Sequence, residues 1–177
     1  MKPDTSEILI SSDEIRDMVA KVADEINNDY GDRPLLVIPV LTGAFIFAAD
    51  LVRLLKMPVE IDFMKVSSYV GQTSTGILKI NKDIAVDVKG RDVLIVEDVI
   101  DTGRTLALLR DMLKERGAAS VKICTAFDKP ARRVIDIRPD YSGIEVGDVF
   151  IVGYGLDLDG RYRDYGDIRI VKDNEEQ

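Results

Sequence analysis

The stretch of residues 93–106 constrains the fold of this chain most, and it reads VLIVEDVIDTGRTL. Its continuous apolar start is typical of a strand that is buried on both faces. Two adjacent acids, Glu97 and Asp98, follow, and a third, Asp101, stands before a Thr-Gly pair. Residues 104–114 carry leucines at helical spacing, which predicts a helix. We therefore expect three carboxylates just past the carboxyl end of a buried strand, next to a helix N-terminus.

Acids beside a small, amide-rich turn favour a sugar phosphate as the ligand. Open α/β sheets bind ligands at the carboxyl ends of their strands, and a helix N-terminus is a ready phosphate site. Glu97 and Asp98 can accept hydrogen bonds from ribose hydroxyls, while residues 101–105 can donate to a phosphate. Because carboxylates alone repel a polyphosphate, a divalent cation is implied, and Mg²⁺ typically takes one or two carboxylates plus substrate oxygens. The alternative is a surface acidic turn that closes a βα unit.

Charge and composition exclude several classes of function. A net charge of −8 and a pI of about 4.7 argue against an extended nucleic-acid surface, which needs Lys and Arg to neutralise phosphates. The chain has no His, which removes Ser–His and Cys–His catalysis and most zinc sites. The single cysteine, Cys124, lies in an apolar run and is predicted to be a core residue. A polar start, and no apolar run near the ~20 residues of a membrane span, predict a cytoplasmic protein.

The remaining pattern predicts a single α/β domain over residues 1–177. Ser11 and Glu14 have the spacing of a capping box, which predicts a helix start. Apolar runs predict strands at 35–40, 59–66, 77–88, 121–127, 150–153 and 168–171, with a second helix at 44–55 and a loop at 67–76. Strands that alternate with helices favour a parallel sheet flanked by helices, with right-handed crossovers.

Other segments suit the same chemistry, although each has an ordinary alternative. Residues 41–44 follow a strand and can present amides to a second anion, but many βα turns contain Gly. Residues 66–76 have the small-residue makeup of a lid, or of a solvated hairpin loop. Lys129 follows a predicted strand, so it can donate to a carbonyl group on a base or lie in a solvated turn. Phe150 can stack on a planar base or belong to a core strand.

Taken in order, these segments resemble the type I phosphoribosyltransferases, and among them the 6-oxopurine, or hypoxanthine(-guanine), phosphoribosyltransferases. Residues 93–106 match the family's motif for phosphoribosyl pyrophosphate (PRPP), and the likeness also rests on residues 41–47, 68–76, 128–133 and 152–163. Within these segments, residues 128–130 and 152–157 separate this subfamily from other PRPP enzymes. The likeness covers about residues 35–171. It implies an α/β fold with a small hood formed by the terminal segments, and a homodimer or homotetramer. It also implies Mg²⁺-dependent transfer of phosphoribose from PRPP to hypoxanthine or guanine in purine salvage, giving IMP or GMP and pyrophosphate.

The resemblance assigns roles to individual residues. Glu97, Asp98 and Asp157 would hold Mg²⁺. Asp101 would act as general base or proton acceptor at purine N7. The residues that would contact substrates are Leu41, Thr42, Gly43, Glu97, Asp98, Asp101, Thr102, Gly103, Arg104, Thr105, Lys129, Phe150, Ile151, Asp157 and Arg163.

Within this set, the base and the pyrophosphate have different partners. Lys129 would donate to purine O6, while Phe150 would stack on the ring and the Ile151 backbone would read the ring edge. Arg163 would bind pyrophosphate, although a solvated arginine is the ordinary alternative for a charged loop.

The lid and the turn at residue 42 leave questions open. Ser68 and Tyr69 would close over the reaction centre. The family often has Lys or Arg where this chain has Thr42, so a cationic side chain is lost and pyrophosphate affinity or subunit contacts are expected to differ. The peptide between Leu41 and Thr42 is often cis in the family.

An alternative function is a regulatory protein on the same fold that senses PRPP or nucleotides. The preference among hypoxanthine, guanine and xanthine stays open.

Overall fold

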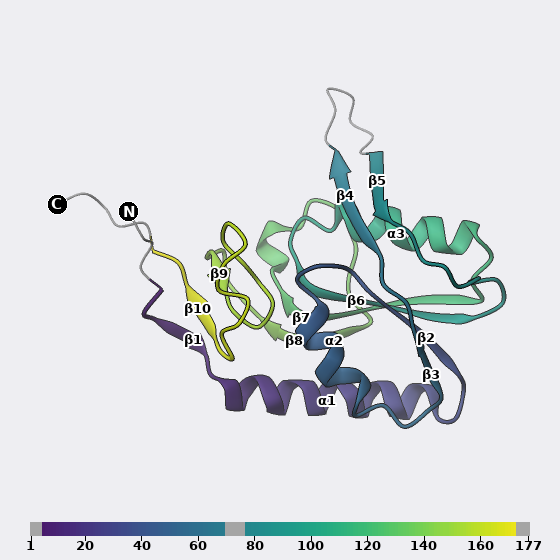
Figure 1. The fold of residues 1–177 in the computed structure, drawn as a ribbon, viewed down its shortest axis with the longest axis horizontal. Helices are drawn as coiled ribbons and strands as arrows, with labels where there is room; N and C mark the ends of the chain where they lie inside the picture. Colours follow the sequence, from purple (N-terminus) through teal and green to yellow (C-terminus); the bar gives the residue numbers. More distant parts are fainter. Residues whose placement is uncertain (1–4, 70–76, 173–177) are drawn as a thin grey trace.

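A computed structural model describes residues 5–69 and 77–172 and is built on one parallel sheet (Figure 1). The strand order is β3-β2-β6-β7-β8, and each neighbouring pair is parallel. The strands are β2 (Leu35–Pro39), β3 (Val59–Ile61), β6 (Asp92–Ile100), β7 (Ser120–Asp128) and β8 (Tyr141–Glu145). The carboxyl ends of all five strands therefore lie along the same edge, as the sequence predicted.

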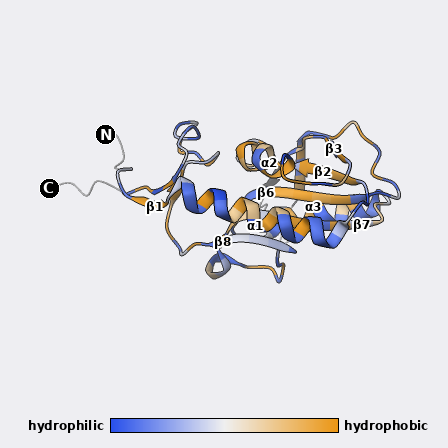
Figure 2. Cartoon of the chain, turned by 90° about the horizontal axis from the view of Figure 1, so that it is seen from below, coloured by the Kyte–Doolittle hydropathy of each residue, from blue (hydrophilic) through white to orange (hydrophobic). Residues whose placement is uncertain are grey.

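Helices cover both faces of the sheet. α1 (Ser12–Tyr30) and α2 (Phe45–Val52) pack with Leu94 and other residues on one face. α3 (Arg104–Glu115) packs with Ile95 and its neighbours on the opposite face. In Figure 2 the strands β2 and β6 are coloured hydrophobic, whereas α1 alternates between hydrophilic and hydrophobic residues along its length. Because successive side chains of a strand point to opposite faces, the continuous apolar run in β6 fills both cores.

The N-terminal helix begins as its sequence predicts. The Ser11 side chain accepts a hydrogen bond from the Glu14 backbone N–H, and the Glu14 carboxylate accepts one from the Ser11 N–H. This capping box satisfies two of the backbone donors that a helix N-terminus leaves without partners. It thereby sets where α1 starts relative to the strand that precedes it.

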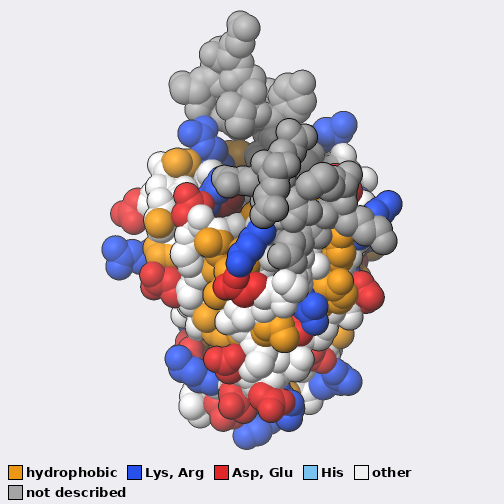
Figure 3. Space-filling model, turned by 90° about the vertical axis from the view of Figure 1, so that its left-hand side faces the viewer, with side chains coloured by type: hydrophobic (Ala, Val, Ile, Leu, Met, Phe, Trp, Pro, Cys, Tyr) orange, Lys and Arg blue, Asp and Glu red, His pale blue; other side chains and the backbone are white. Residues whose placement is uncertain are grey.

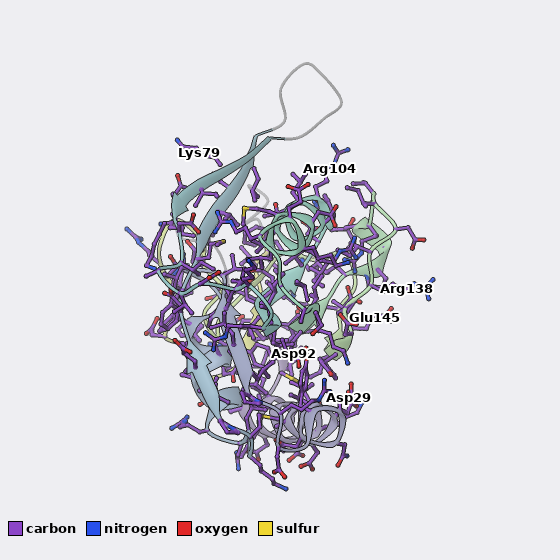
Figure 4. All side chains as sticks on the ribbon, turned by 90° about the vertical axis from the view of Figure 1, so that its right-hand side faces the viewer. Asp29, Lys79, Asp92, Arg104, Arg138 and Glu145 are labelled. Atoms are coloured by element: carbon purple, nitrogen blue, oxygen red, sulfur yellow. The ribbon has the colours of Figure 1, made fainter. Side chains whose placement is uncertain are left out.

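Two smaller sheets flank the central one. β1 (Ile8–Ile10), β10 (Ile168–Ile170) and β9 (Ile151–Val152) form an antiparallel sheet in the order β1-β10-β9. This sheet is the predicted hood of terminal segments, at the left of Figure 1. β4 (Lys65–Tyr69) and β5 (Ile77–Lys82) form an antiparallel hairpin. Lys79 on this hairpin and Arg104 at the start of α3 lie at one end of the molecule, and Asp29 lies at the other (Figure 4).

Several sequence predictions need correction. The strand predicted at 77–88 ends at Lys82, and β4 runs to Tyr69, into the predicted loop at 67–76. β6 continues to Ile100, so Glu97 and Asp98 lie inside the strand and only Asp101 lies past its end. The extension is held by pairing with β7 as far as Ile100 and Asp128. The predicted strand at 59–66 is two strands, because the Asp62 carboxylate accepts hydrogen bonds from the backbone of 63, 85 and 86 and turns the chain. The helix predicted at 44–55 is shorter, ending at Val52.

The sequence did not predict β1, β8 or the short 3₁₀ helix η1 (Pro130–Arg132). Each is three to five residues long, too short for a periodic pattern to emerge. None of the helices within 5–69 and 77–172 is long and apolar enough to cross a membrane.

Candidate active site

Two adjoining cavities open at the carboxyl edge of the sheet. The first has a volume of about 320 Å³ and lies between β2, β6 and the start of α3. The second has a volume of about 290 Å³ and lies between the end of β7 and the hood. Three residues, Val99, Asp101 and Asp157, line both. The two cavities are thus compartments of one site, and Asp101 stands at their junction.

The first cavity brings together most of the residues predicted to contact a phosphorylated ribose. Two turns and part of the hood meet there. The predicted residues that line it are Leu41, Thr42, Gly43, Glu97, Asp98, Asp101, Thr102, Gly103, Thr105, Asp157 and Arg163. The peptide between Leu41 and Thr42 is cis.

The turn before α3 depends on a glycine. Gly103 is the N-cap residue of α3 and has φ +82°, a left-handed conformation that side chains other than glycine rarely adopt. A Cβ atom there would lie 2.4 Å from Cγ2 of Ile137 and 3.1 Å from Cδ of Arg133. The turn is therefore seated against the chain that follows β7. Its amides stand at the positive end of the α3 dipole, where an anion is favoured.

Glu97 and Asp98 form a crowded pair of carboxylates. Burial raises the pKa of Glu97 well above its ordinary value, and the neighbouring Asp98 charge raises it further. Burial also raises the pKa of Asp98. The Asp98 carboxylate lies against Gly43, where an added Cβ would come within 1.5 Å of Oδ2. Hydroxyl donors or a cation would stabilise the ionised form of these two carboxylates, because either one compensates charge that water no longer solvates.

The donor set fits Mg²⁺ that arrives with a phosphorylated substrate. Among the residues that the structure describes, no three acidic or cysteine side chains converge closely enough to hold a metal ion alone. The chain instead offers the Glu97–Asp98 pair, and Asp157 lies nearby with its Oδ1 2.8 Å from Nη2 of Arg163. Mg²⁺ commonly takes one or two carboxylates, waters and substrate phosphate oxygens rather than a full protein cage.

The hood closes on the first cavity through direct backbone contact. Arg163 donates from Nη1 to the carbonyl oxygen of Gly155 at 2.6 Å. A Cβ atom on Gly155 would lie 2.1 Å from the carbonyl oxygen of Gly43, so the hood and the turn after β2 touch there. Arg163 and Asp157 are thereby held beside the turn that carries Thr42.

The second cavity has the features of a pocket for a flat, polar ring. Lys129 is buried, and its ammonium donates to the carbonyl oxygen of Val149 at 2.7 Å. Burial lowers the pKa of Lys129, and the charge of Asp101 opposes that shift. Phe150 is 54% exposed although it is a large apolar side chain, and Ile151 lies beside it. An exposed ring on the wall of a cavity is available for stacking.

Some residues of the second cavity were not identified from the sequence. Arg132 and Asp148 line it together with the apolar Val149 and Leu156. Arg132 belongs to the segment 128–133 that the sequence singled out, but its partners come from two other elements. No local pattern could have revealed them, because the contacts span 16 and 31 residues of the chain.

Of the predicted residues whose side chains the structure describes, Arg104 alone does not line either cavity. Ser68 and Tyr69 are the last two residues of β4, whose Val66 does line the first cavity. The rest of the predicted lid, residues 70–76, lies outside the described residues. Arg104 is the first residue of α3 and follows the turn directly.

Comparisons with known proteins give concordant results. A family model described as the phosphoribosyl transferase domain matches residues 8–159. The hypoxanthine-guanine phosphoribosyltransferase of Bacillus subtilis is 46% identical over 173 residues, 97% of this chain and 96% of that protein. The enzyme of the same name from Streptococcus pneumoniae is 44% identical over 174 residues, 98% of this chain and 97% of that protein. The crystal structure of a hypoxanthine-guanine phosphoribosyltransferase from Bacillus anthracis superimposes with a TM-score of 0.92 at 42% identity, covering 96% of this chain and all of that one.

Proposed function

The chain belongs to the phosphoribosyltransferase family, and we propose that it is a purine-salvage enzyme that transfers phosphoribose from PRPP to hypoxanthine or guanine. The products are IMP or GMP and pyrophosphate. The observation that carries this proposal is the pair of cavities that meet at Asp101. One cavity suits a phosphorylated ribose, the other suits a 6-oxopurine, and the bond to be made lies between them.

In the reaction, purine N9 forms a bond to ribose C1, and the bond from C1 to the pyrophosphate oxygen breaks with its electron pair leaving on that oxygen. C1 carries positive character at the transition state. Glu97 and Asp98 bind the ribose hydroxyls, and the turn at 102–105 holds the 5′-phosphate. Arg163 and the amides of the turn at Thr42 bind the pyrophosphate and stabilise the charge that develops on it.

The base is held by its edge and its face. Lys129, already oriented by the Val149 carbonyl, donates to O6, and Phe150 stacks on the ring. Asp101 faces N7 and accepts its proton or a hydrogen bond from it, so that N9 can attack. A 6-oxo group is thus distinguished from the 6-amino group of adenine, since an ammonium can only donate.

Mg²⁺ bound with PRPP would be held by Glu97, Asp98 and Asp157, and would neutralise charge on the departing pyrophosphate. We also propose that the chain forms homo-oligomers. Phe45, Leu54 and Ile61 are each more than 40% exposed, and exposed apolar groups of this size suit burial against a partner.

The decisive experiment is turnover with Mg²⁺ and PRPP against hypoxanthine, guanine, xanthine, adenine and uracil. Product from hypoxanthine or guanine, and none from adenine or uracil, is expected. This panel also settles the preference among the three 6-oxopurines. No product with any base would contradict the proposal and, with measurable PRPP binding, would favour the sensor.

A regulatory PRPP sensor is the weaker candidate. On the face seen in Figure 3, among the residues drawn in colour, acidic and basic side chains are intermingled rather than gathered into a basic patch. A sensor needs no group at the base position, whereas Asp101 and Lys129 both line the second cavity. These features support catalysis.

A further inference from the structure

We propose that Arg132 is a positioning residue that orients Asp101 toward N7 of the incoming purine and joins it to the wall that carries Phe150. This inference rests on the proposed function, because it concerns how the base cavity recognises its ligand. It adds a residue to that cavity which the resemblance to known enzymes does not assign.

Arg132 lies between two acids from separate elements. Its Nε is 2.5 Å from Oδ1 of Asp101, just past the end of β6. Its Nη1 donates to Oδ1 of Asp148 at 2.9 Å, in the segment between β8 and β9. The 3₁₀ turn η1 holds the residue in place, because the Arg132 N–H donates to the carbonyl oxygen of Lys129 at 3.1 Å. Asp101, Arg132 and Asp148 all line the second cavity, which is proposed to bind the base.

The contact with Arg132 gives the two oxygens of the Asp101 carboxylate different surroundings. Oδ1 is buried and forms an ion pair with Arg132, but it accepts no hydrogen bond. The Asp101 side chain as a whole is 44% exposed, so its accessible part lies away from Oδ1. Arg132 therefore engages one oxygen and leaves Oδ2 for a donor on the ligand. In a purine, the N7–H is such a donor.

The second contact ties this arrangement to the stacking wall. Asp148 stands two residues before Phe150, and the residue between them, Val149, accepts the Lys129 hydrogen bond. Lys129 thus donates one hydrogen bond to Val149, while Arg132 spans from Asp101 to Asp148. A guanidinium suits this bridge because its planar fork can engage two acceptors at once, which an ammonium does with less fixed geometry.

The test compares hypoxanthine with 7-deazahypoxanthine, in which a C–H group replaces N7 and the ring shape is kept. If Arg132 acts through Asp101 and N7, Arg132→Met weakens the binding of hypoxanthine only, because only hypoxanthine can donate a hydrogen bond from position 7. We expect the KM for hypoxanthine to rise about tenfold and the Ki of the analogue and the KM for PRPP to change by less than about twofold. Arg132→Lys, which keeps the charge but not the fork, should give an intermediate loss for hypoxanthine alone.

A matched control is Arg138→Met. Arg138 also lies between β7 and β8, but its side chain reaches outward (Figure 4). This variant should leave all three constants unchanged. Equal losses for hypoxanthine and the analogue in Arg132→Met, or no loss for either, would overturn the role of Arg132. Wild-type turnover is measured first, because its absence would overturn the proposed function itself, whereas normal wild-type turnover with equal losses would overturn only this inference.

Discussion

The pKa values of carboxylates at the two ends of the central sheet are shifted in opposite directions. At the amino end, Asp29 accepts hydrogen bonds from Lys122 at 2.7 Å and from Tyr141 at 2.6 Å, and its pKa is lowered mainly by the Lys122 contact. At the carboxyl end, Glu97 and Asp98 face each other, and burial raises the pKa of both. Asp29 lies far from the end where the hairpin extends (Figure 4).

Lysines near the two ends of β7 show the same contrast. Lys122, near the start of β7, is paired with Asp29, which raises its pKa. Lys129, just past the end of β7, has a pKa lowered by burial, and it donates to a neutral carbonyl. The charged groups at the amino end are therefore paired within the protein, whereas burial leaves those at the carboxyl end in need of compensation that a substrate can supply. Such unfavourable shifts are common at functional sites, where stability is given up for chemistry.

The largest effect is expected when both carboxylates of the crowded pair are replaced by amides, in the double variant Glu97→Gln, Asp98→Asn. Turnover should fall by roughly 10³-fold, because the ribose hydroxyls and Mg²⁺ lose their charged partners. Stability at pH 7 should stay equal or rise, since two poorly solvated like charges are removed. Steady-state kinetics and urea denaturation check both. A clear loss of stability would show that the pair is structural and would break the comparison.

A second test isolates the junction between the cavities. Asp101→Asn keeps the shape of the side chain but cannot take a proton, so kcat should fall about 10²-fold. PRPP binding, measured by calorimetry in the presence of Mg²⁺, should stay within about twofold of wild type, since the proposed role of Asp101 is to contact the base. Unchanged turnover would remove Asp101 from the role of base.

The difference between the two ends also explains what the sequence could predict. The first cavity is built largely from continuous segments, and its strand, turn and helix over 93–106 were recognisable from local pattern. The second cavity joins Lys129 to Val149 and Arg132 to Asp148, which only the folded chain brings together. The position of Glu97 and Asp98 inside β6 was missed for a related reason. Pairing with β7 extends the strand through residues that have low intrinsic strand preference.

A third test uses the lysines near the two ends of β7, Lys122 and Lys129, as a matched pair. Lys129→Met should raise the KM for hypoxanthine by about 10- to 100-fold, the value of a charged hydrogen bond to O6, and leave the KM for PRPP unchanged. Lys122→Met should leave both constants unchanged and lower stability by about 1 kcal/mol, because Asp29 and Tyr141 lose a donor. Impaired turnover in Lys122→Met would mean that the two ends are coupled, and would blur the contrast.

The smallest expected effect belongs to Asp29→Asn. Its side chain is half exposed, so solvent screens the pair and the loss of stability at pH 7 should be less than about 1 kcal/mol. Because the pKa of Asp29 is lowered in the folded state, its contribution is complete above the ordinary Asp value of about 3.9 and is lost as pH falls through the lowered value. Urea denaturation of both proteins from pH 7 down to pH 3 should show their stabilities converging. A stability difference that does not shrink on acidification would mean that Asp29 acts through shape rather than charge, and the contrast between the ends would then rest on Lys122 and Lys129 alone.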